Sequence, residues 1–367
     1  MPTDRAYLDH NATSPLRPEA RAAMLEAMEL IGNPSSVHAE GRAAKAVLER
    51  ARRQVAALVG AKPDQVVFTS GGTEALSTVL AGHAGPLVVS AIEHAALLEP
   101  AQARNAILAP AQSDGRADPT AYHAADGADV LRAIQLANNE TGVEQDVASI
   151  AHGDGSSLTD AVQAAGKRAL DMSSLGVDHL AISAHKIGGP KGVGALISSS
   201  DRSHTALLRG GGQERGGRAG TENLVGIAGF GAAAKAAERD LDAFADLAEW
   251  RDAIEAAVTK QTPDAVVVAQ ASPRLPNTSC IALPGISAET LVMALDLEGV
   301  AVSAGSACSS GKVTRSHVLE AMGLDDAITG SAIRVSLGWN SSKKDVDRFT
   351  TAWAAVTNRL ARQQRTL

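Results

Sequence analysis

The stretch LAISAHKIGGPKG, residues 180–192, places a lysine directly after an apolar run and before a cluster of glycine and proline. Residues 178–184 predict a buried parallel strand, which the following glycines and proline end. Lys186 is therefore expected at the carboxyl end of a strand, where open α/β sheets bind their ligands. An amine in a partly desolvated site can lose its proton near neutral pH and attack a carbonyl to form a Schiff base. The simpler alternative is a solvated loop lysine.

The composition is that of an ordinary globular protein. The chain has 367 residues, of which 45% are hydrophobic and 20% charged, enough for one large domain with a smaller one or for two comparable domains. Aromatic residues make up only 2%, which argues against stacking platforms for single-stranded nucleic acid. The formal net charge of −7 provides no basic field for nucleic acid or an anionic membrane. We expect neither as a partner.

The lack of a targeting signal in the sequence and the small number of cysteines point to the cytoplasm. No apolar stretch is long enough to span a bilayer, and residues 1–15 lack the apolar segment of a signal peptide. The two cysteines are too few for a disulfide framework and fit a reducing compartment. Cys280 has apolar neighbours and is expected to be buried. Cys308 lies among the small and polar residues 303–312, which predict a mobile, exposed loop, and an accessible thiol there has the environment of a nucleophile.

Strand and helix patterns alternate between about residues 55 and 199, as a mostly parallel, doubly wound sheet requires. The expected strands in this part are residues 65–69, 87–91, 134–137, 156–159 and 178–184, and helices are expected over 18–31 and 41–59. Residues 222–258 predict a long alanine-rich helical region interrupted by Gly226, Gly229 and Gly231, and the change of domain falls inside it. A smaller α+β domain follows, with strands over 266–268, 278–283 and 300–303 and helices over 288–297 and 343–362.

The strand over residues 65–69 leads into SGGTE, residues 70–74, and then into a helix. A glycine turn at a helix start directs backbone N–H groups and the positive end of the helix dipole at one spot, which suits a phosphate. Thr73 could add a hydroxyl donor. The pattern is neither a P-loop nor a dinucleotide fingerprint, and a plain turn between strand and helix is the alternative.

Later strands deliver further polar side chains to the same edge of the sheet. His94 follows the second strand and could stack on a ring or move protons. Asn139 follows the third strand, in NNETG, and Asp160 and Gln163 follow the fourth, in DAVQ. Together with Thr73 and Lys186, these residues occupy five successive strand ends. Such convergence favours a ligand site and argues against the solvated lysine.

Three other stretches leave alternatives open. Arg334 lies in the apolar IRVSLG, residues 333–338, where an unpaired charge is costly. A substrate carboxylate would satisfy it through a bidentate contact, and so would a structural salt bridge with Asp or Glu. The glycine-rich loop over residues 210–221 carries two arginines that could reach a neighbouring subunit or an anion, or it is a flexible linker. Residues 7–15, YLDHNATSP, are interpreted most simply as an exposed loop.

Taken together, these motifs make the chain similar to the pyridoxal-phosphate-dependent cysteine desulfurases, in the class V aminotransferase group of fold type I enzymes. The matching motifs cover nearly the whole chain, in the order YLDHNATSP, SGGTE, EHAAL, NNETG, DAVQAAGK, SAHKIGGPKGVGAL, GGGQERGGRAGT, SAGSACSSG and IRVSLG. The cysteine stretch and the SHVL after it resemble the branch with a longer mobile cysteine loop. The resemblance implies a large domain over residues 14–240, with a mostly parallel seven-stranded sheet. A small α+β domain formed by residues 1–13 and 241–367 would carry the cysteine loop.

The resemblance also implies a role for each candidate residue. Lys186 forms the Schiff base with pyridoxal phosphate, and Asp160 pairs with the ring nitrogen so that the ring acts as an electron sink. His94 stacks on the ring and handles protons, and Cys308 attacks the substrate sulfur. The other implied ligands are Gly72, Thr73, Ser183 and His185 at the phosphate, with Thr221 from the partner subunit of a homodimer, Gln163 and Asn139 on the side of the ring hydroxyl, and Arg334 at the substrate carboxylate. The resemblance implies no metal.

The implied reaction converts L-cysteine to L-alanine and leaves a persulfide on Cys308. The sulfur then passes to an acceptor protein such as an iron–sulfur scaffold, for iron–sulfur cluster assembly or tRNA thiolation. The chain departs from the family pattern in shorter spans over residues 84–88 and 146–156, and in Gly188 and Gly189 after the lysine. One alternative is another enzyme of the group, such as a selenocysteine lyase or a transaminase. A non-catalytic sulfur-transfer or assembly partner is the other.

Overall fold

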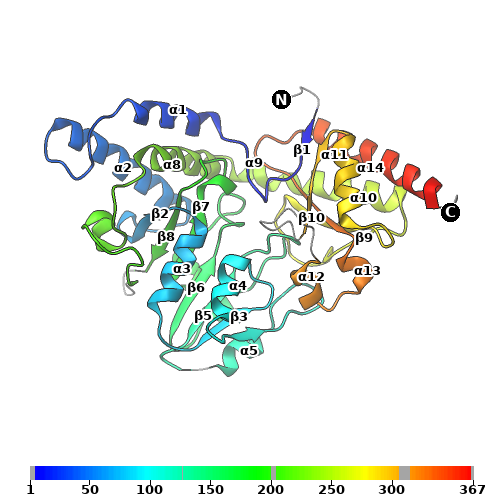
Figure 1. Cartoon of the computed structure of the whole chain (residues 1–367), viewed down its shortest axis with the longest axis horizontal. Helices are drawn as coiled ribbons and strands as arrows, with labels where there is room; N and C mark the ends of the chain where they lie inside the picture. Colours follow the sequence, from blue (N-terminus) through cyan, green and yellow to red (C-terminus); the bar gives the residue numbers. More distant parts are fainter. Residues whose placement is uncertain (1–4, 126, 200–203, 306–314, 365–367) are drawn as a thin grey trace.

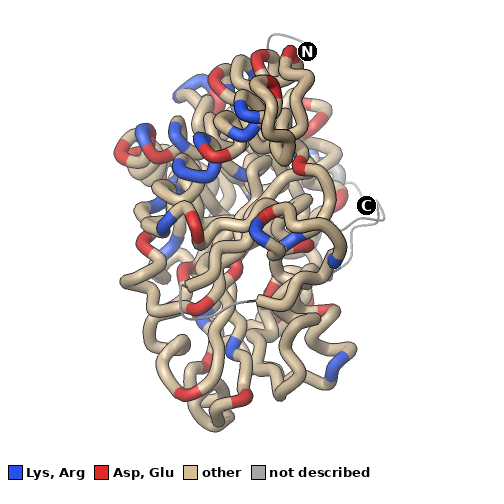
Figure 2. The backbone as a smooth tube through the Cα atoms, turned by 90° about the vertical axis from the view of Figure 1, so that its left-hand side faces the viewer, with Lys and Arg blue, Asp and Glu red and all other residues tan. Residues whose placement is uncertain are grey.

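The computed structural model describes residues 5–125, 127–199, 204–305 and 315–364. Figure 1 shows a large sheet with helices on both faces, and beside it a smaller lobe built from a short sheet and the C-terminal helices. The predicted α/β class is confirmed. Among the described residues, none of the helices combines the length and apolar character needed to cross a membrane. Figure 2 shows Lys and Arg positions interspersed with Asp and Glu positions on the side that carries the N-terminal helices.

The large sheet has seven strands in the order β2-β8-β7-β6-β5-β3-β4. Their bounds are β2 Val66–Thr69, β3 Leu87–Ser90, β4 Ile107–Ala109, β5 Leu131–Gln135, β6 Ser156–Asp160, β7 His179–Ser183 and β8 Gly194–Ser198. Strand β8 is antiparallel to both of its neighbours, and the other pairs are parallel. Every strand except β8 therefore ends at the same edge. Five of these ends carry the side chains that the sequence predicts for the ligand site.

Helices cover both faces of this sheet, because successive strand residues point to opposite sides. Val88 and Ile182 belong to the core under one helical layer, and Val89 and Ala181 belong to the core under the other. The helices of this part and its short 3-10 turns are α1 Pro18–Met28, α2 Ala39–Leu58, η1 Pro63–Gln65, α3 Gly72–Gly82, α4 Ala95–Gln102, α5 Pro119–Ala124, α6 Val147–Ala151, α7 Met172–Leu175, η2 Ala184–Lys186, η3 Gln213–Gly216 and α8 Leu224–Arg239. Helices α2 and α8 lie on the first face, and α3 and α4 on the second.

Helix α8 corrects one prediction, because its glycines do not interrupt it. A Cβ atom on Gly231 would lie 2.6 Å from Ala51 Cα, and one on Gly229 would lie 2.6 Å from Met24 Cγ. The glycines thus let α8 approach α1 and α2 closely. The chain then continues through α9 Leu241–Ala245 and α10 Leu247–Gln261 into the smaller lobe.

The smaller lobe contains a four-stranded sheet in the order β12-β13-β10-β9. The lobe's elements are β9 Val266–Val267, β10 Thr278–Ala282, α11 Ala288–Leu297, β11 Val300–Ala301, β12 Ser303–Ala304, α12 His317–Ala321, α13 Asp326–Thr329, β13 Ala332–Ser336 and α14 Lys343–Gln364. The expected strand over residues 300–303 divides in two, because β11 pairs with β1 Ala6–Tyr7 whereas β12 pairs with β13. This pairing joins the N-terminus to the C-terminal lobe. It supports the division at residues 14 and 240, which stays a prediction.

The segment after β1 is not the exposed loop that its composition suggests. His10 and Asn11 are only 2% and 1% exposed. The Asn11 N–H donates to Ser336 Oγ at 3.0 Å, and its side-chain amide donates to Thr278 Oγ1 at 2.9 Å. Polar residues can be buried when their hydrogen bonds are made inside the protein. The N-terminal segment is therefore part of the structure around the strand ends.

Candidate active site

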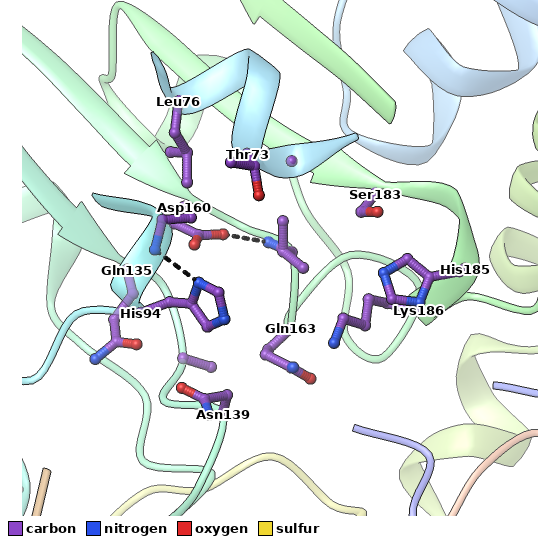
Figure 3. Close-up of a pocket in the computed structure, with 14 residues that line it drawn as sticks. Thr73, Leu76, His94, Gln135, Asn139, Asp160, Gln163, Ser183, His185 and Lys186 are labelled. Carbon is purple, nitrogen blue, oxygen red and sulfur yellow. Dashed lines mark hydrogen bonds between the residues drawn. The ribbon is translucent and has the colours of Figure 1, made fainter. Parts of the chain in front are cut away.

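A pocket of about 230 Å³ opens at the edge where the strands end (Figure 3). It is lined by all the predicted cofactor residues except Thr221, namely Gly72, Thr73, His94, Asn139, Asp160, Gln163, Ser183, His185 and Lys186. These residues come from the ends of five strands and from the turns that follow them. The sheet topology is what brings them together, because parallel strands end at a common edge.

The start of α3 forms one wall of the pocket through Gly72 and Thr73. A Cβ atom on Gly72 would lie 2.8 Å from Val162 Cγ2, so this position has no room for a side chain. Free N–H groups at the first turn of an eleven-residue helix favour an anion. On the neighbouring strand end, Ser183 lines the pocket and His185 Nδ1 lies 3.2 Å from Thr13 Oγ1.

Asp160 and His94 lie on a second wall, and burial affects both. Desolvation raises the pKa of Asp160, while the charges of His94 and Lys186 lower it. Desolvation also lowers the pKa of His94. His94 Nδ1 accepts a hydrogen bond from the Ala96 N–H at 3.1 Å. A neutral ring with this contact carries its proton on Nε2. Asp160 Oδ1 is held by the Val162 N–H at 2.9 Å.

Lys186 is a pocket residue, so the solvated-loop alternative is wrong. Its Nζ donates to the backbone oxygens of Asn11 at 2.6 Å and Ala12 at 3.0 Å. Burial lowers the pKa of this amine to about 8, and the Arg334 charge acts in the same direction. Asp160 opposes the shift. With this pKa, part of the Lys186 amine is neutral near neutral pH, so the amine can act as a nucleophile and can also accept or give a proton.

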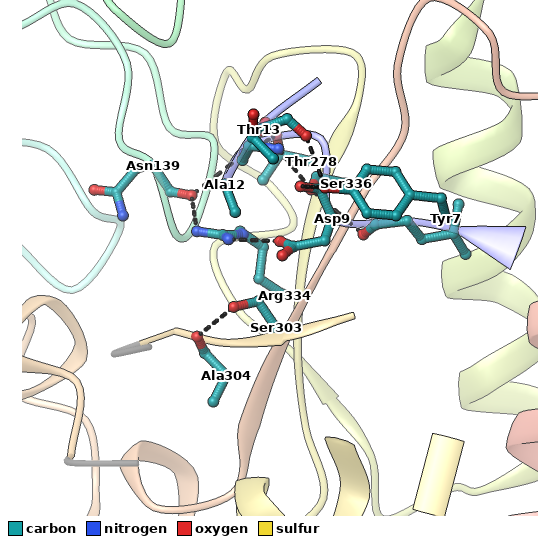
Figure 4. A network of polar contacts seen from close by, with 12 residues as sticks. Tyr7, Asp9, Ala12, Thr13, Asn139, Thr278, Ser303, Ala304, Arg334 and Ser336 are labelled. Carbon is teal, nitrogen blue, oxygen red and sulfur yellow. Dashed lines mark hydrogen bonds and ion pairs between the residues drawn. The ribbon is translucent and has the colours of Figure 1, made fainter. Parts of the chain in front are cut away.

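Arg334 lies beside the pocket and forms the salt bridge that the sequence leaves as one alternative (Figure 4). Its Nη2 lies 2.8 Å from Asp9 Oδ1, and its Nη1 donates to the backbone oxygen of Asn139 at 3.0 Å. Its Nε is buried without a hydrogen-bond partner among the described residues. Tyr7 donates to the Thr13 oxygen at 2.8 Å in the same network. The guanidinium therefore contacts a pocket-lining residue without itself lining the pocket.

The remaining predicted residues lie away from this pocket. Thr221 is exposed and does not line the pocket within the described part of the chain. It follows η3, and Arg218 in the same glycine-rich loop pairs with Glu74 at 3.0 Å. Cys308 falls in residues 306–314, outside the described residues. Cys280 is fully buried, as predicted, and burial raises the pKa of its thiol to about 12.

Comparison with known proteins agrees with this geometry over almost the whole chain. A family profile described as Aminotransferase class-V matches residues 6–349. A cysteine desulfurase from Cereibacter sphaeroides is 42% identical, with 97% of each chain covered. The chain belongs to the cysteine desulfurases of the class V aminotransferase family. Cysteine desulfurase IscS from Dictyoglomus turgidum is 40% identical, with 93% of this chain and 91% of the relative covered. The crystal structure of a NifS-like protein from Rickettsia africae superposes with a TM-score of 0.89 at 32% identity, covering 96% and 99%.

Cysteine desulfurases depend on pyridoxal phosphate, and the residues present fit this cofactor. The pocket offers an amine of lowered pKa at Lys186, a buried carboxyl at Asp160 and a helix start without a side chain at Gly72. These groups suit, respectively, an aldehyde, a protonated ring nitrogen and a phosphate.

Several residues around the desulfurase pocket have no role assigned from the sequence. Asn11, Lys167 and Glu140 are buried and hydrogen-bonded to pocket residues or their neighbours. All three lie inside motifs that carry the family resemblance, namely YLDHNATSP, DAVQAAGK and NNETG. Their place in these motifs is therefore the sequence signal that could have identified the three residues. Their partners are distant in the sequence, which is why local patterns do not reveal what they contact.

Schiff-base formation needs the neutral amine of Lys186, so its rate should depend on pH. With a pKa of about 8, the neutral fraction increases as pH rises to that value and is nearly complete above it. We expect the rate at which the cofactor-free desulfurase captures pyridoxal phosphate to rise about tenfold per pH unit below this pKa and then level off. Stopped-flow absorbance measures this rate. A rate that continues to rise to about pH 10 would show an unshifted lysine and contradict the burial argument.

Ser316 holds Glu140 and the start of α12 together. Its Oγ donates to Glu140 Oε2 at 2.5 Å and accepts from the Leu319 N–H at 3.1 Å. Replacing Ser316 by alanine leaves a buried carboxyl and a helix N–H without this partner. We expect the free energy of unfolding to fall by about 1–3 kcal/mol. Chemical denaturation measures this loss, with exposed Ser35→Ala as the control that should change stability by less than about 0.5 kcal/mol. Equal effects of the two variants would contradict the anchoring role.

Proposed function

We propose that the protein is a pyridoxal-phosphate-dependent cysteine desulfurase that removes sulfur from L-cysteine and leaves L-alanine and a persulfide on Cys308. The observation that carries this proposal is the convergence of Lys186, Asp160 and His94 in one pocket, from the ends of three strands. The similarity to a cysteine desulfurase at 42% identity supports the choice of substrate.

The pocket residues divide into two groups. At the phosphate end we place the N–H groups at the start of α3, the Thr73 hydroxyl, Ser183 and His185, with Thr221 from the partner subunit of a homodimer. Asp160 would pair with the ring nitrogen, while Gln163 and Asn139 would face the ring hydroxyl side and His94 would lie against the ring. When bound, pyridoxal phosphate supplies an electron-withdrawing ring that stabilises negative charge on the substrate carbon.

Lys186 would move the proton of the substrate Cα. Its lowered pKa leaves a useful fraction of neutral amine near pH 7–8, as a general base requires. After taking the proton, the ammonium has two acceptors in place, the backbone oxygens of Asn11 and Ala12. His94 keeps a proton on Nε2 because its Nδ1 is occupied by the Ala96 N–H. A proton is thus available on each side of the site.

Arg334 would bind the substrate carboxylate, with Asn139 beside it. The buried Nε is a donor without a partner among the described residues, so the guanidinium has capacity for a further acceptor. Asp9 pairs with Nη2 of the same guanidinium. This arrangement directs the guanidinium toward Asn139 and supports a role in orienting the substrate.

The sulfur would leave the substrate through Cys308. The Cβ–S bond of L-cysteine breaks while a bond forms between the substrate sulfur and Cys308 Sγ. The electron pair of the broken bond stays on the carbon, which is protonated to give L-alanine, so no external oxidant or reductant is needed. Cys280 is unsuited to this step, because its buried thiol has a pKa of about 12 and stays protonated.

The persulfide would then be passed to an acceptor protein in the cytoplasm. A relative carrying the name IscS supports an iron–sulfur scaffold as the acceptor, with tRNA thiolation as the other destination. Thr221 is exposed and does not line the chain's own pocket in the described part of the chain, which supports its use by a second copy in a homodimer.

The decisive experiment incubates the purified holoenzyme with L-cysteine and measures L-alanine together with persulfide on Cys308. A desulfurase forms both in equal amounts in the first turnover. A transaminase would instead release the keto acid of cysteine, and a selenocysteine lyase would turn over L-selenocysteine while leaving L-cysteine unchanged. A non-catalytic assembly partner would lack the absorbance band of a protonated Schiff base.

A further inference from the structure

Lys167 is a buried amine directly behind the pocket wall. It lies four residues after Gln163, in the turn that follows β6, and is only 3% exposed. Its Nζ donates to Asn11 Oδ1 at 2.7 Å and to Gln163 Oε1 at 2.8 Å. Burying an amine is costly unless it makes strong hydrogen bonds, so these two contacts matter to the folded protein. The reaction outlined above gives this amine no role.

The contact with Lys167 determines which way the Gln163 amide faces. An amide can turn over and exchange its oxygen and nitrogen, but a donor at Oε1 holds one orientation. The Gln163 nitrogen then points away from Lys167, and it donates to the Asn11 backbone oxygen at 3.0 Å. An amide nitrogen carries two N–H groups. Because Gln163 lines the pocket, the second N–H is available to a ligand there.

Asn11 completes the arrangement from the other side. Its Oδ1 accepts from Asn277 Nδ2 at 3.1 Å as well as from Lys167. Its backbone oxygen accepts from Gln163 and from Lys186. Lys167 therefore contacts Gln163 and also Asn11, whose backbone oxygen accepts from the Lys186 amine. Burial lowers the pKa of Lys167 well below its usual value, and the charges of Lys186 and Arg334 act in the same direction.

We infer that Lys167 is a positioning residue that makes Gln163 present an N–H donor, and not a carbonyl oxygen, to the ring oxygen of pyridoxal phosphate. The identity of this ligand rests on the proposed function. Without Lys167, only the hydrogen bond to the Asn11 backbone oxygen still holds the Gln163 amide in this orientation. The turned orientation, in which the Gln163 oxygen faces the ring oxygen and the two acceptors repel, then becomes more populated. The expected defect is therefore weaker binding of a ligand that has the ring hydroxyl.

The test is a double-mutant cycle of Lys167→Met and Gln163→Met, read out as cofactor affinity of the protein with its cofactor removed. Methionine keeps the apolar stem of Lys167 and removes the donor. We expect each single variant to weaken pyridoxal phosphate about tenfold, since one net hydrogen bond is lost. The double variant should be no weaker than Gln163→Met alone, because Lys167 acts through Gln163. With 3-deoxypyridoxal phosphate, which lacks the ring hydroxyl, all four proteins should bind alike.

Two outcomes would overturn the inference. Multiplicative losses in the double variant would mean that Lys167 acts independently of Gln163, and an equal loss with the deoxy analogue would mean a general structural role. Thermal unfolding of each protein measures the structural contribution separately. If Lys167→Met does not fold, Lys167→Gln is used, whose side chain is one heavy atom shorter and cannot keep both hydrogen bonds at their present lengths.

The unmodified protein separates this inference from the proposed function. If it binds pyridoxal phosphate but releases no sulfur from L-cysteine, the proposed function fails while the affinity comparison still tests Lys167. If it releases sulfur and Lys167→Met keeps its full preference for the ring hydroxyl, the inference alone fails.

Discussion

Replacing Lys186 by alanine is expected to remove the covalent hold on pyridoxal phosphate and to lower the rate of sulfur release by at least about 10³-fold. The reason is that Lys186 brings an amine with a pKa of about 8 into the pocket, where it serves both as the attachment point and as the base. The absorbance of the Schiff base and the yield of L-alanine from L-cysteine measure the two losses.

The control for this variant is Lys191→Ala, which removes an exposed lysine five residues further along and should leave both measurements unchanged. Borohydride reduction followed by mass spectrometry identifies which lysine is attached. A reducible bond that persists in Lys186→Ala at normal activity would show that another amine does this work.

Replacing Cys308 by serine is expected to abolish the protein persulfide and to reduce L-alanine formation at least about 10²-fold, while the cofactor absorbance stays intact. The hydroxyl of serine is a far weaker nucleophile toward sulfur than a thiolate. The affinity for pyridoxal phosphate should not change, because the residues proposed to hold the cofactor do not include Cys308.

The matched control is Cys280→Ala, which removes the other cysteine. Its thiol is fully buried in β10 and stays protonated, so the variant should retain activity within about twofold. Persulfide on Cys280 in the Cys308→Ser protein, or sulfur release at the normal rate, would exclude Cys308 as the sulfur acceptor. Mass spectrometry of the two cysteine-containing peptides distinguishes these results.

Local chemistry explains why so much of the site could be predicted. The strands before His94, Asp160 and Lys186 are short apolar runs that end in turn-forming residues, and such runs indicate buried parallel strands. Figure 3 shows these side chains together because the strand ends share one edge. The reversed direction of β8 could not be predicted in this way, because its residues read as a buried strand in either direction.

Contacts across the chain explain what could not be predicted. Glycine inside an alanine-rich helix usually weakens it, yet α8 is continuous because its glycines meet α1 and α2 at close range. Composition marks the segment around Asn11 as a turn, but it is buried where the smaller lobe meets the strand ends. In both cases packing between distant segments outweighs the local preference.

By itself, the sequence determined the α/β alternation, the residues at the strand ends and the family, because strand, turn and motif chemistry lies within a few neighbouring residues. Only the tertiary structure decided that Arg334 pairs with Asp9 across 325 positions, and that Lys167 reaches Asn11 across 156. These groups meet because the N-terminal segment packs between the strand ends and the smaller lobe. There, a buried charge or amine must take whatever partner the fold brings within hydrogen-bond distance.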